Sequence, residues 1–319
     1  MSTSLDITGL LLKAESSYGT DAAPVGAADG LRLSDRTAAW IVDPDYAYPN
    51  ERDTAVSGDL LPVAPGNPEG RVTSLSFGWE VRGKGSAYTA VGQLGPAGAA
   101  LAACGFTESF GAGALTFTLG SQTRTGVTIW AYAGGKLFKV TGCQGTVEWT
   151  CPAGEITLLT FTMQGMVRQA VTEVALPSIT SYNTQIPPAF VNASASLNDG
   201  SAWSPDLVES TVTTGADVVR EANANAVDGI GGFTIARYRA SVSVRAKERS
   251  IASGFNPYTG LDQRKATTID WTVGATASNR AKLDVNTAYL TGIQHEDQDG
   301  LAGWNMTYGR IGHLALVFD

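Results

Sequence analysis

The sequence predicts a mainly β protein in which one β-unit occurs twice. In residues 136–165, apolar and polar side chains alternate on both sides of a turn at residues 152–154. A period of two buries one set of side chains and exposes the other, while Pro152 and Gly154 suit a tight reversal. The same plan returns at residues 282–309, and a Thr-Ile strand precedes each copy, at Thr128 and Thr268. We therefore expect two tandem β domains, residues 1–175 and 176–319, each with a short helix or helical turn packed on its sheet.

Composition favours a globular chain rich in strands and turns. Of 319 residues, 43% are hydrophobic and 16% charged. The 37 glycines are well above the usual share of ~7%. A net charge of −8 repels phosphate backbones, so DNA binding is disfavoured. The N-terminus lacks a basic start, and no apolar run approaches the ~18 residues of a membrane span. We expect a soluble protein made in a cytoplasm.

The three cysteines favour free thiols. Cys104, Cys143 and Cys151 are too few for a disulfide scaffold, and their spacing matches no zinc pattern. Cys143 and Cys151 could face each other across a ladder, but free, partly buried thiols in a reducing compartment are the favoured interpretation.

The first half opens with a short strand or arm at residues 10–12, a turn-rich passage at 15–24 and a strand at 31–33. Residues 43–70 then lose all periodicity and carry five prolines and six acidic residues. A loop of this length inside a domain is either functional or simply solvated. In the functional interpretation, the side chains that would anchor this loop against a partner are those of Tyr46, Tyr48, Leu60 and Leu61.

Strict alternation at residues 71–82 predicts the clearest strand of the protein. Residues 95–105 predict a short helix, with Pro96 in its first turn and Gly105 as a C-terminal cap. Because it has few apolar positions, this helix suits a place on a sheet rather than an independent one.

Residues 168–188 form a linker marked by Pro177 and a Pro-Pro pair. The second half begins with a strand-like stretch at 189–197 and an acidic, Asn-rich loop at 217–228. One strand at 233–245 then places Arg237, Arg239 and Arg245 on a single face, and an apolar strand at 313–319 closes the chain.

We find no catalytic, cofactor-binding or metal-binding constellation, so the sequence predicts no enzyme. His295 and His313 have no partner at the spacing of a metal site or a triad. Residues 297–300 resemble part of a calcium loop, but the full pattern is missing and a polar hairpin turn is favoured. The aromatic residues that alternate into the predicted core are Trp79, Trp130, Trp149, Trp271 and Trp304.

Three passages together resemble the major tail tube proteins of long-tailed, non-contractile bacteriophages. They are residues 13–24, KAESSYGTDAAP; residues 101–106, LAACGF; and residues 135–147, GKLFKVTGCQGTV, leading to TFTMQG at 160–165. In the second half, residues 204–209, 274–280 and 297–300 are similar to the same family. The departures are the arginine-bearing strand and the short second helix region.

The resemblance implies a structural protein of the virion tail, assembled in the host cytoplasm. Such proteins form stacked rings whose inner wall is a closed β-barrel, the conduit that carries the genome. Implied partners are further copies of the chain, the tape-measure, tail-terminator and distal tail proteins, and passing double-stranded DNA without specific binding. An acidic wall would let DNA slide without sticking. Polar faces that suit a wetted bore supply the lumen-facing candidates Ser74, Ser76, Glu80, Glu148, Thr160, Thr162, Gln164, Asn305 and Thr307.

A doubled unit implies that one chain fills two of six ring positions, giving a homotrimer with approximate sixfold symmetry. The alternative is a homohexamer whose second half decorates the outside. Residues expected between rings or subunits are the four loop anchors Tyr46, Tyr48, Leu60 and Leu61, together with Arg237, Arg239 and Arg245. Competing interpretations are a secreted-type β-sandwich that binds or hydrolyses carbohydrate, and a tail-fibre or capsid decoration protein.

Overall fold

The computed structural model describes residues 7–34, 40–41, 71–121, 123–226, 229–251, 254–298 and 300–319. Two short helices accompany the strands: α1 (Pro96–Ala103) and α2 (Pro257–Asp262). The first strands are β1 (Ile7–Ala14), β2 (Gly30–Leu31), β3 (Trp40–Ile41), β4 (Val72–Glu80), β5 (Phe106–Gly111), β6 (Ala114–Leu119), β7 (Val127–Ala133), β8 (Lys136–Pro152), β9 (Leu158–Met166) and β10 (Thr172–Glu173).

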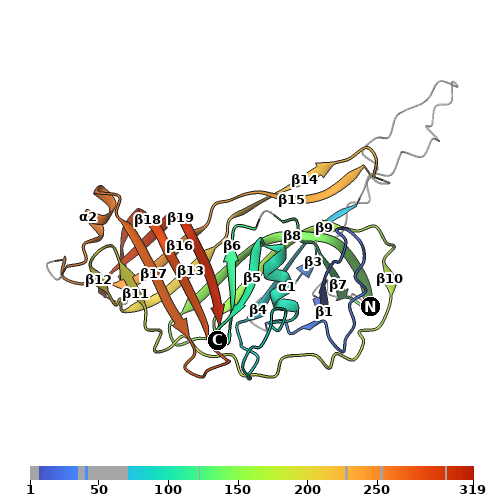
Figure 1. Cartoon of the computed structure of the whole chain (residues 1–319), viewed down its shortest axis with the longest axis horizontal. Helices are drawn as coiled ribbons and strands as arrows, with labels where there is room; N and C mark the ends of the chain where they lie inside the picture. Colours follow the sequence, from blue (N-terminus) through green and yellow to red (C-terminus); the bar gives the residue numbers. More distant parts are fainter. Residues whose placement is uncertain are drawn as a thin grey trace, which may run out of the picture.

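The remaining strands are β11 (Ser196–Asn198), β12 (Ala202–Trp203), β13 (Leu207–Thr213), β14 (Ala216–Ala222), β15 (Ile230–Tyr238), β16 (Ser241–Lys247), β17 (Ala266–Val273), β18 (Ala281–Gln298) and β19 (Leu301–Phe318). The protein is mainly β, as the alternation predicts. In the described part of the chain, β14 and β15 form a separate two-stranded arm, and the other strands belong to one hydrogen-bonded sheet (Figure 1).

The same set of antiparallel pairings occurs twice along the chain. In the first set, β1 pairs with β2 and β7, β7 with β8, β8 with β9, β9 with β4, and β4 with β3. In the second, β11 pairs with β12 and β17, β17 with β18, β18 with β19, β19 with β16, and β16 with β13. Both long hairpins expected from the alternation, β8–β9 and β18–β19, are present.

Two ladders join these sets of strands directly. The C-terminal part of β8 pairs with β13, from Glu148 opposite Thr213 to Pro152 opposite Glu209. The hairpin β5–β6 reaches across so that β6 pairs with the end of β19. Among the described residues, the strands of a single chain do not close into a barrel.

One face of this sheet supplies the core. The predicted inner set of β4, from Thr73 to Trp79, is buried throughout, and α1 lies on the sheet with Ala100 and Leu101 fully buried. Gly105 follows α1 at a φ of 90°, in the left-handed region expected of a cap glycine. Four of the five predicted core tryptophans are buried; Trp130 is only half-buried.

Several sequence expectations were wrong in detail. Residues 217–228 do not form only a loop, because β14 runs through residues 216–222, and residues 233–245 are divided between β15 and β16 by a break at 239–240. Cys143 and Cys151 cannot face each other across a ladder, since both lie on β8; all three cysteines are free and buried, as favoured. Residues 189–197 contribute only the start of β11.

Candidate assembly surfaces

The sheet has a polar face opposite its core face. Glu148, Thr162, Gln164 and Thr307 are exposed there, while Ser74, Thr160 and Asn305 are half-buried. Cross-strand pairs bring most of them together: Ser74 lies opposite Gln164, Thr160 opposite Glu148, and Thr162 opposite both Ser76 and Thr146. These strands therefore present one continuous polar surface on this side of the sheet.

Two of the polar-face candidates are not available on this surface. Ser76 is 5% exposed in the single chain and lies between β9 and β3. The Glu80 carboxylate accepts a hydrogen bond from the buried Arg82 guanidinium at 2.5 Å, and Arg82 also donates to the Gln185 carbonyl at 3.1 Å. Because Arg82 is 1% exposed, Glu80 is needed to compensate a buried charge.

Arg245 is the one predicted interface arginine that lies on the main sheet, on β16. It donates to Glu209 at 2.7 Å and to Glu296 at 2.8 Å. Hydrogen bonding from Arg245 holds the pKa of Glu296 below its usual value. This arginine therefore already has two carboxylate partners within its own chain. Arg237 also has a partner in its own chain, Asp217, at 2.9 Å.

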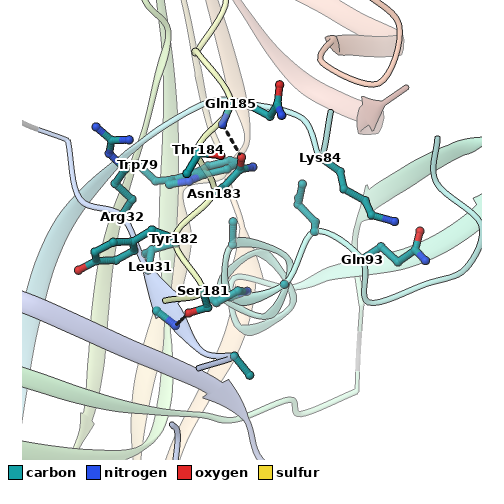
Figure 2. Close-up of a pocket in the computed structure, with 16 residues that line it drawn as sticks. Leu31, Arg32, Trp79, Lys84, Gln93, Ser181, Tyr182, Asn183, Thr184 and Gln185 are labelled. Carbon is teal, nitrogen blue, oxygen red and sulfur yellow. Dashed lines mark hydrogen bonds between the residues drawn. The ribbon is translucent and has the colours of Figure 1, made fainter. Parts of the chain in front are cut away.

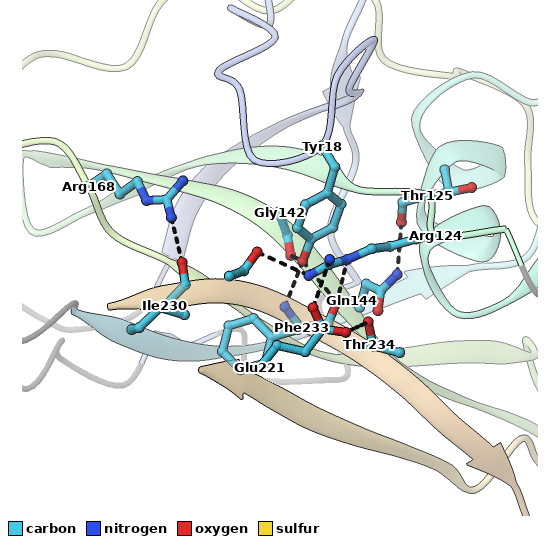
Figure 3. A network of polar contacts seen from close by, with 11 residues as sticks. Tyr18, Arg124, Thr125, Gly142, Gln144, Arg168, Glu221, Ile230, Phe233 and Thr234 are labelled. Carbon is cyan, nitrogen blue, oxygen red and sulfur yellow. Dashed lines mark hydrogen bonds and ion pairs between the residues drawn. The ribbon is translucent and has the colours of Figure 1, made fainter. Parts of the chain in front are cut away.

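Polar contacts hold the arm β14–β15 against Tyr18, Arg124 and β8 (Figure 3). The Tyr18 hydroxyl lies 2.7 Å from the Gly142 carbonyl oxygen and accepts a hydrogen bond from the Phe233 amide at 2.8 Å. The Arg124 guanidinium stacks 3.7 Å from the Tyr18 ring, donates to the Phe233 carbonyl at 2.9 Å, and pairs with Glu221 at 2.9 Å. These contacts link residues from three distant parts of the sequence.

An apolar cluster lies beside this polar network. Met166, Ile230 and Phe233 are buried together, with Val72 and Val218 packed against them. At the root of the network, the Glu15 carboxylate accepts hydrogen bonds from the amides of Gly19 and Gly142 at 2.6 and 2.7 Å. Burial raises the pKa of Glu15 although these bonds favour its charged form. Glu15, Tyr18 and Gly142 belong to the passages at 13–24 and 135–147, but the partner on β15, Phe233, carries no sequence signal.

A polar pocket of about 350 Å³ lies between the segment at residues 181–185 and the start of α1 (Figure 2). Arg32, Trp79, Lys84, Tyr182 and Gln185 contribute to its wall. No group of three or more His, Cys, Asp or Glu residues that could hold a metal occurs in the described part of the chain. No helix among the described residues is long and apolar enough to span a membrane.

Long paired strands, a continuous polar face and a docked arm define a structural β protein. The family model for phage tail tube proteins matches residues 7–299. The chain therefore belongs to the phage tail tube family, and it is a structural component of the virion tail. No curated protein matches the chain.

Proposed function

We propose that the chain contains two tube-type units in tandem, residues 1–175 and 176–319, and that its copies form stacked rings through which the genome passes. The repeated set of pairings supports the duplication, because each strand from β11 to β13 and from β16 to β19 has a counterpart in the first half. The tape-measure, tail-terminator and distal tail proteins would be the partners of this tube.

The β8–β13 ladder is the observation on which the ring geometry rests. In this ladder Val212 lies opposite Trp149 and both side chains are buried, which supports two units that lie side by side in one sheet. A second unit that only decorated the outside of a ring would not continue the sheet of the first. Three chains would therefore supply six units and close a ring with true threefold and approximate sixfold symmetry.

The polar face is proposed to line the bore, with Glu148 as its main single charge. Arg245 also lies on this side of the sheet, but two carboxylates surround it, so its positive charge does not offer DNA an isolated contact. Glu80, by contrast, acts as the partner of Arg82.

Residues 43–70, with Tyr46, Tyr48, Leu60 and Leu61, lie outside the described residues. Their proposed role is contact between subunits or rings. In chain order they separate β3 from β4, as the arm β14–β15 separates the counterparts β13 and β16. Deleting residues 46–67 is expected to leave a folded protein that no longer polymerises; normal tubes from this variant would contradict the role.

Electron cryomicroscopy of the purified, assembled protein tests the main proposal. We expect stacked rings with a central bore and three chains in each ring. Monodisperse particles without a bore would contradict the tube, and six chains in each ring would contradict the tandem arrangement.

A variant pair tests the polar face. Glu148→Lys should assemble but bind duplex DNA in a salt-sensitive way, because the lysine adds phosphate contacts along the bore. Glu173→Lys makes the same charge change at an exposed position of β10 and serves as the control. Equal DNA binding by the two variants would place Glu148 outside the DNA path.

A further inference from the structure

Several strands of the main sheet, among them β5, pair on one side only among the described residues, and two such edges, on β18 and β3, hold the places that β8 and β13 hold in the ladder within the chain. Residues 290–298 of β18 pair with β19 on one side only, because β17 extends no further than Ala266 opposite Tyr289. At the other end of the sheet, β3 pairs with β4 alone. Open edges present unpaired N–H and C=O groups that are a template for another strand.

We propose that the β18 edge of one copy pairs with β3 of a second copy, with His295 opposite Ile41. This inference rests on the proposed ring and adds to it the edge, the partner strand and the register. The occupant is a second copy because β3 holds the place in the first set of pairings that β13 holds in the second. The β13 strand already pairs with β8, the counterpart of β18.

The register follows from a row of residues that crosses the junction within the chain. The row contains the successive cross-strand neighbours Leu290, Tyr308, Val242, Val212, Trp149, Leu159 and Trp79. All seven side chains are buried, so the row stays on the core face as it passes from one unit to the other.

The counterpart row of the first unit is Gly145, Met163, Leu75 and Ile41. Gly145 and Leu290 are equivalent positions because each lies two residues after the same register shift. The β7–β8 ladder shifts register once, next to Cys143, and the β17–β18 ladder shifts register once, next to Ala288. Crossing the junction thus leads from Val212 to Trp149, four residues beyond Gly145 on β8.

Repeating this step at the open edge gives the second junction. The row through Ile41 must continue onto β18 of the neighbouring copy at the residue equivalent to Trp149. That residue is His295, because His295 lies opposite Trp304 in the β18–β19 pair as Trp149 lies opposite Leu159 in the equivalent β8–β9 pair. Ile41 is 2% exposed and shares the core face. His295, whose side chain is 63% exposed in the single chain, would be covered there by the second copy.

The geometry of closure agrees with this register. Each unit contributes four strands to the row and advances it by four residues, when the extra residue of the bulge between Leu290 and Gly292 is not counted. Six units would therefore give about 24 strands with a shear of about 24. Equal strand number and shear corresponds to a tilt of roughly 36°, as in an eight-stranded barrel of shear eight. With ~4.8 Å between strands, the backbone wall would be about 45 Å across, which leaves room for a double helix.

Cysteine cross-linking in assembled tubes tests the junction. Ile41→Cys combined with His295→Cys should form an interchain disulfide on oxidation, because Cα atoms opposite each other in an antiparallel pair are ~4.5–5.5 Å apart. The same Ile41→Cys with Ile293→Cys or Asp297→Cys, two residues away on the same face, provides matched controls. The natural cysteines are buried and contribute little background. The cross-linked ladder should end at three chains.

The outcomes separate the inference from the proposed function. Tubes that cross-link preferentially through position 295 support the register. Tubes that cross-link best at 293 or 297, or not at all, overturn it while the tube function stands. If the wild-type protein forms no tubes, the proposed function fails first. If the double variant does not assemble, hydrogen exchange of the wild type decides: amides in 290–298 must gain protection on assembly, and unchanged exchange overturns the edge.

Discussion

Replacing Arg124 by alanine is expected to loosen the arm β14–β15 from the main sheet without unfolding the protein. The guanidinium contacts the Phe233 carbonyl at 2.9 Å, Glu221 at 2.9 Å and the Tyr18 ring at 3.7 Å, and it donates a longer hydrogen bond to the Gly231 carbonyl at 3.3 Å. Arg124 and Glu221 are 30% and 42% exposed, so their ion pair contributes about 0.5 kcal/mol. The stacking adds about 0.5–1 kcal/mol, and the hydrogen bond to the carbonyl about 1 kcal/mol.

Loss of these contributions lowers the free energy of opening the arm by about 2 kcal/mol, which corresponds to roughly 30-fold faster exchange of its protected amides. The Phe233 amide, bonded to the Tyr18 hydroxyl, is the reporter, and hydrogen exchange followed by mass spectrometry or NMR is the assay. Arg237→Ala removes an exposed pair on the same arm and should change exchange by less than about threefold. Unchanged exchange in Arg124→Ala, or an equal effect of Arg237→Ala, would refute the anchoring role.

Three further predictions concern stability. Trp149→Ala should lower the free energy of unfolding by about 3–5 kcal/mol, because it leaves a cavity in the core at the β8–β13 ladder. A chemical denaturation midpoint near that of the wild type would contradict this. Glu80→Ala should cost about 2–4 kcal/mol by leaving the buried Arg82 charge without its carboxylate; thermal unfolding measures it, and Glu173→Ala is the inert control. Arg245 lowers the pKa of Glu296 in the folded protein, so the stability from this pair is present above the unfolded pKa of Glu296 and is lost as the pH falls through its folded pKa. Between pH 6 and pH 3 the melting temperature of Arg245→Met should therefore fall less steeply than that of the wild type. An identical pH dependence of the melting temperature would count against the pairing.

The strand pattern was readable in the sequence because it depends on local alternation. Residues 71–82 and the two long hairpins alternate strictly, and burial of one face follows directly from a period of two. The helix at 96–103 was equally accessible, since Pro96 and Gly105 mark its ends through backbone geometry alone.

Other features depended on partners far away in the chain. Glu80 has the sequence position of an outward polar residue, yet Arg82 and the linker carbonyls give it a structural role. The strand β14 was mistaken for part of an acidic loop, because it alternates weakly and its arm is held by Tyr18 and Arg124, more than 90 residues distant.

The sequence by itself determined that this is a strand-rich protein with a repeated hairpin and a tail tube resemblance. Periodicity and motif spacing are local properties and survive in a linear reading. Only the tertiary structure decided that the two halves share one sheet through β8 and β13, with Val212 opposite Trp149. Register between strands separated by some 60 residues is set by the fit of buried side chains and by ladder hydrogen bonds, and neither exists until the chain has folded.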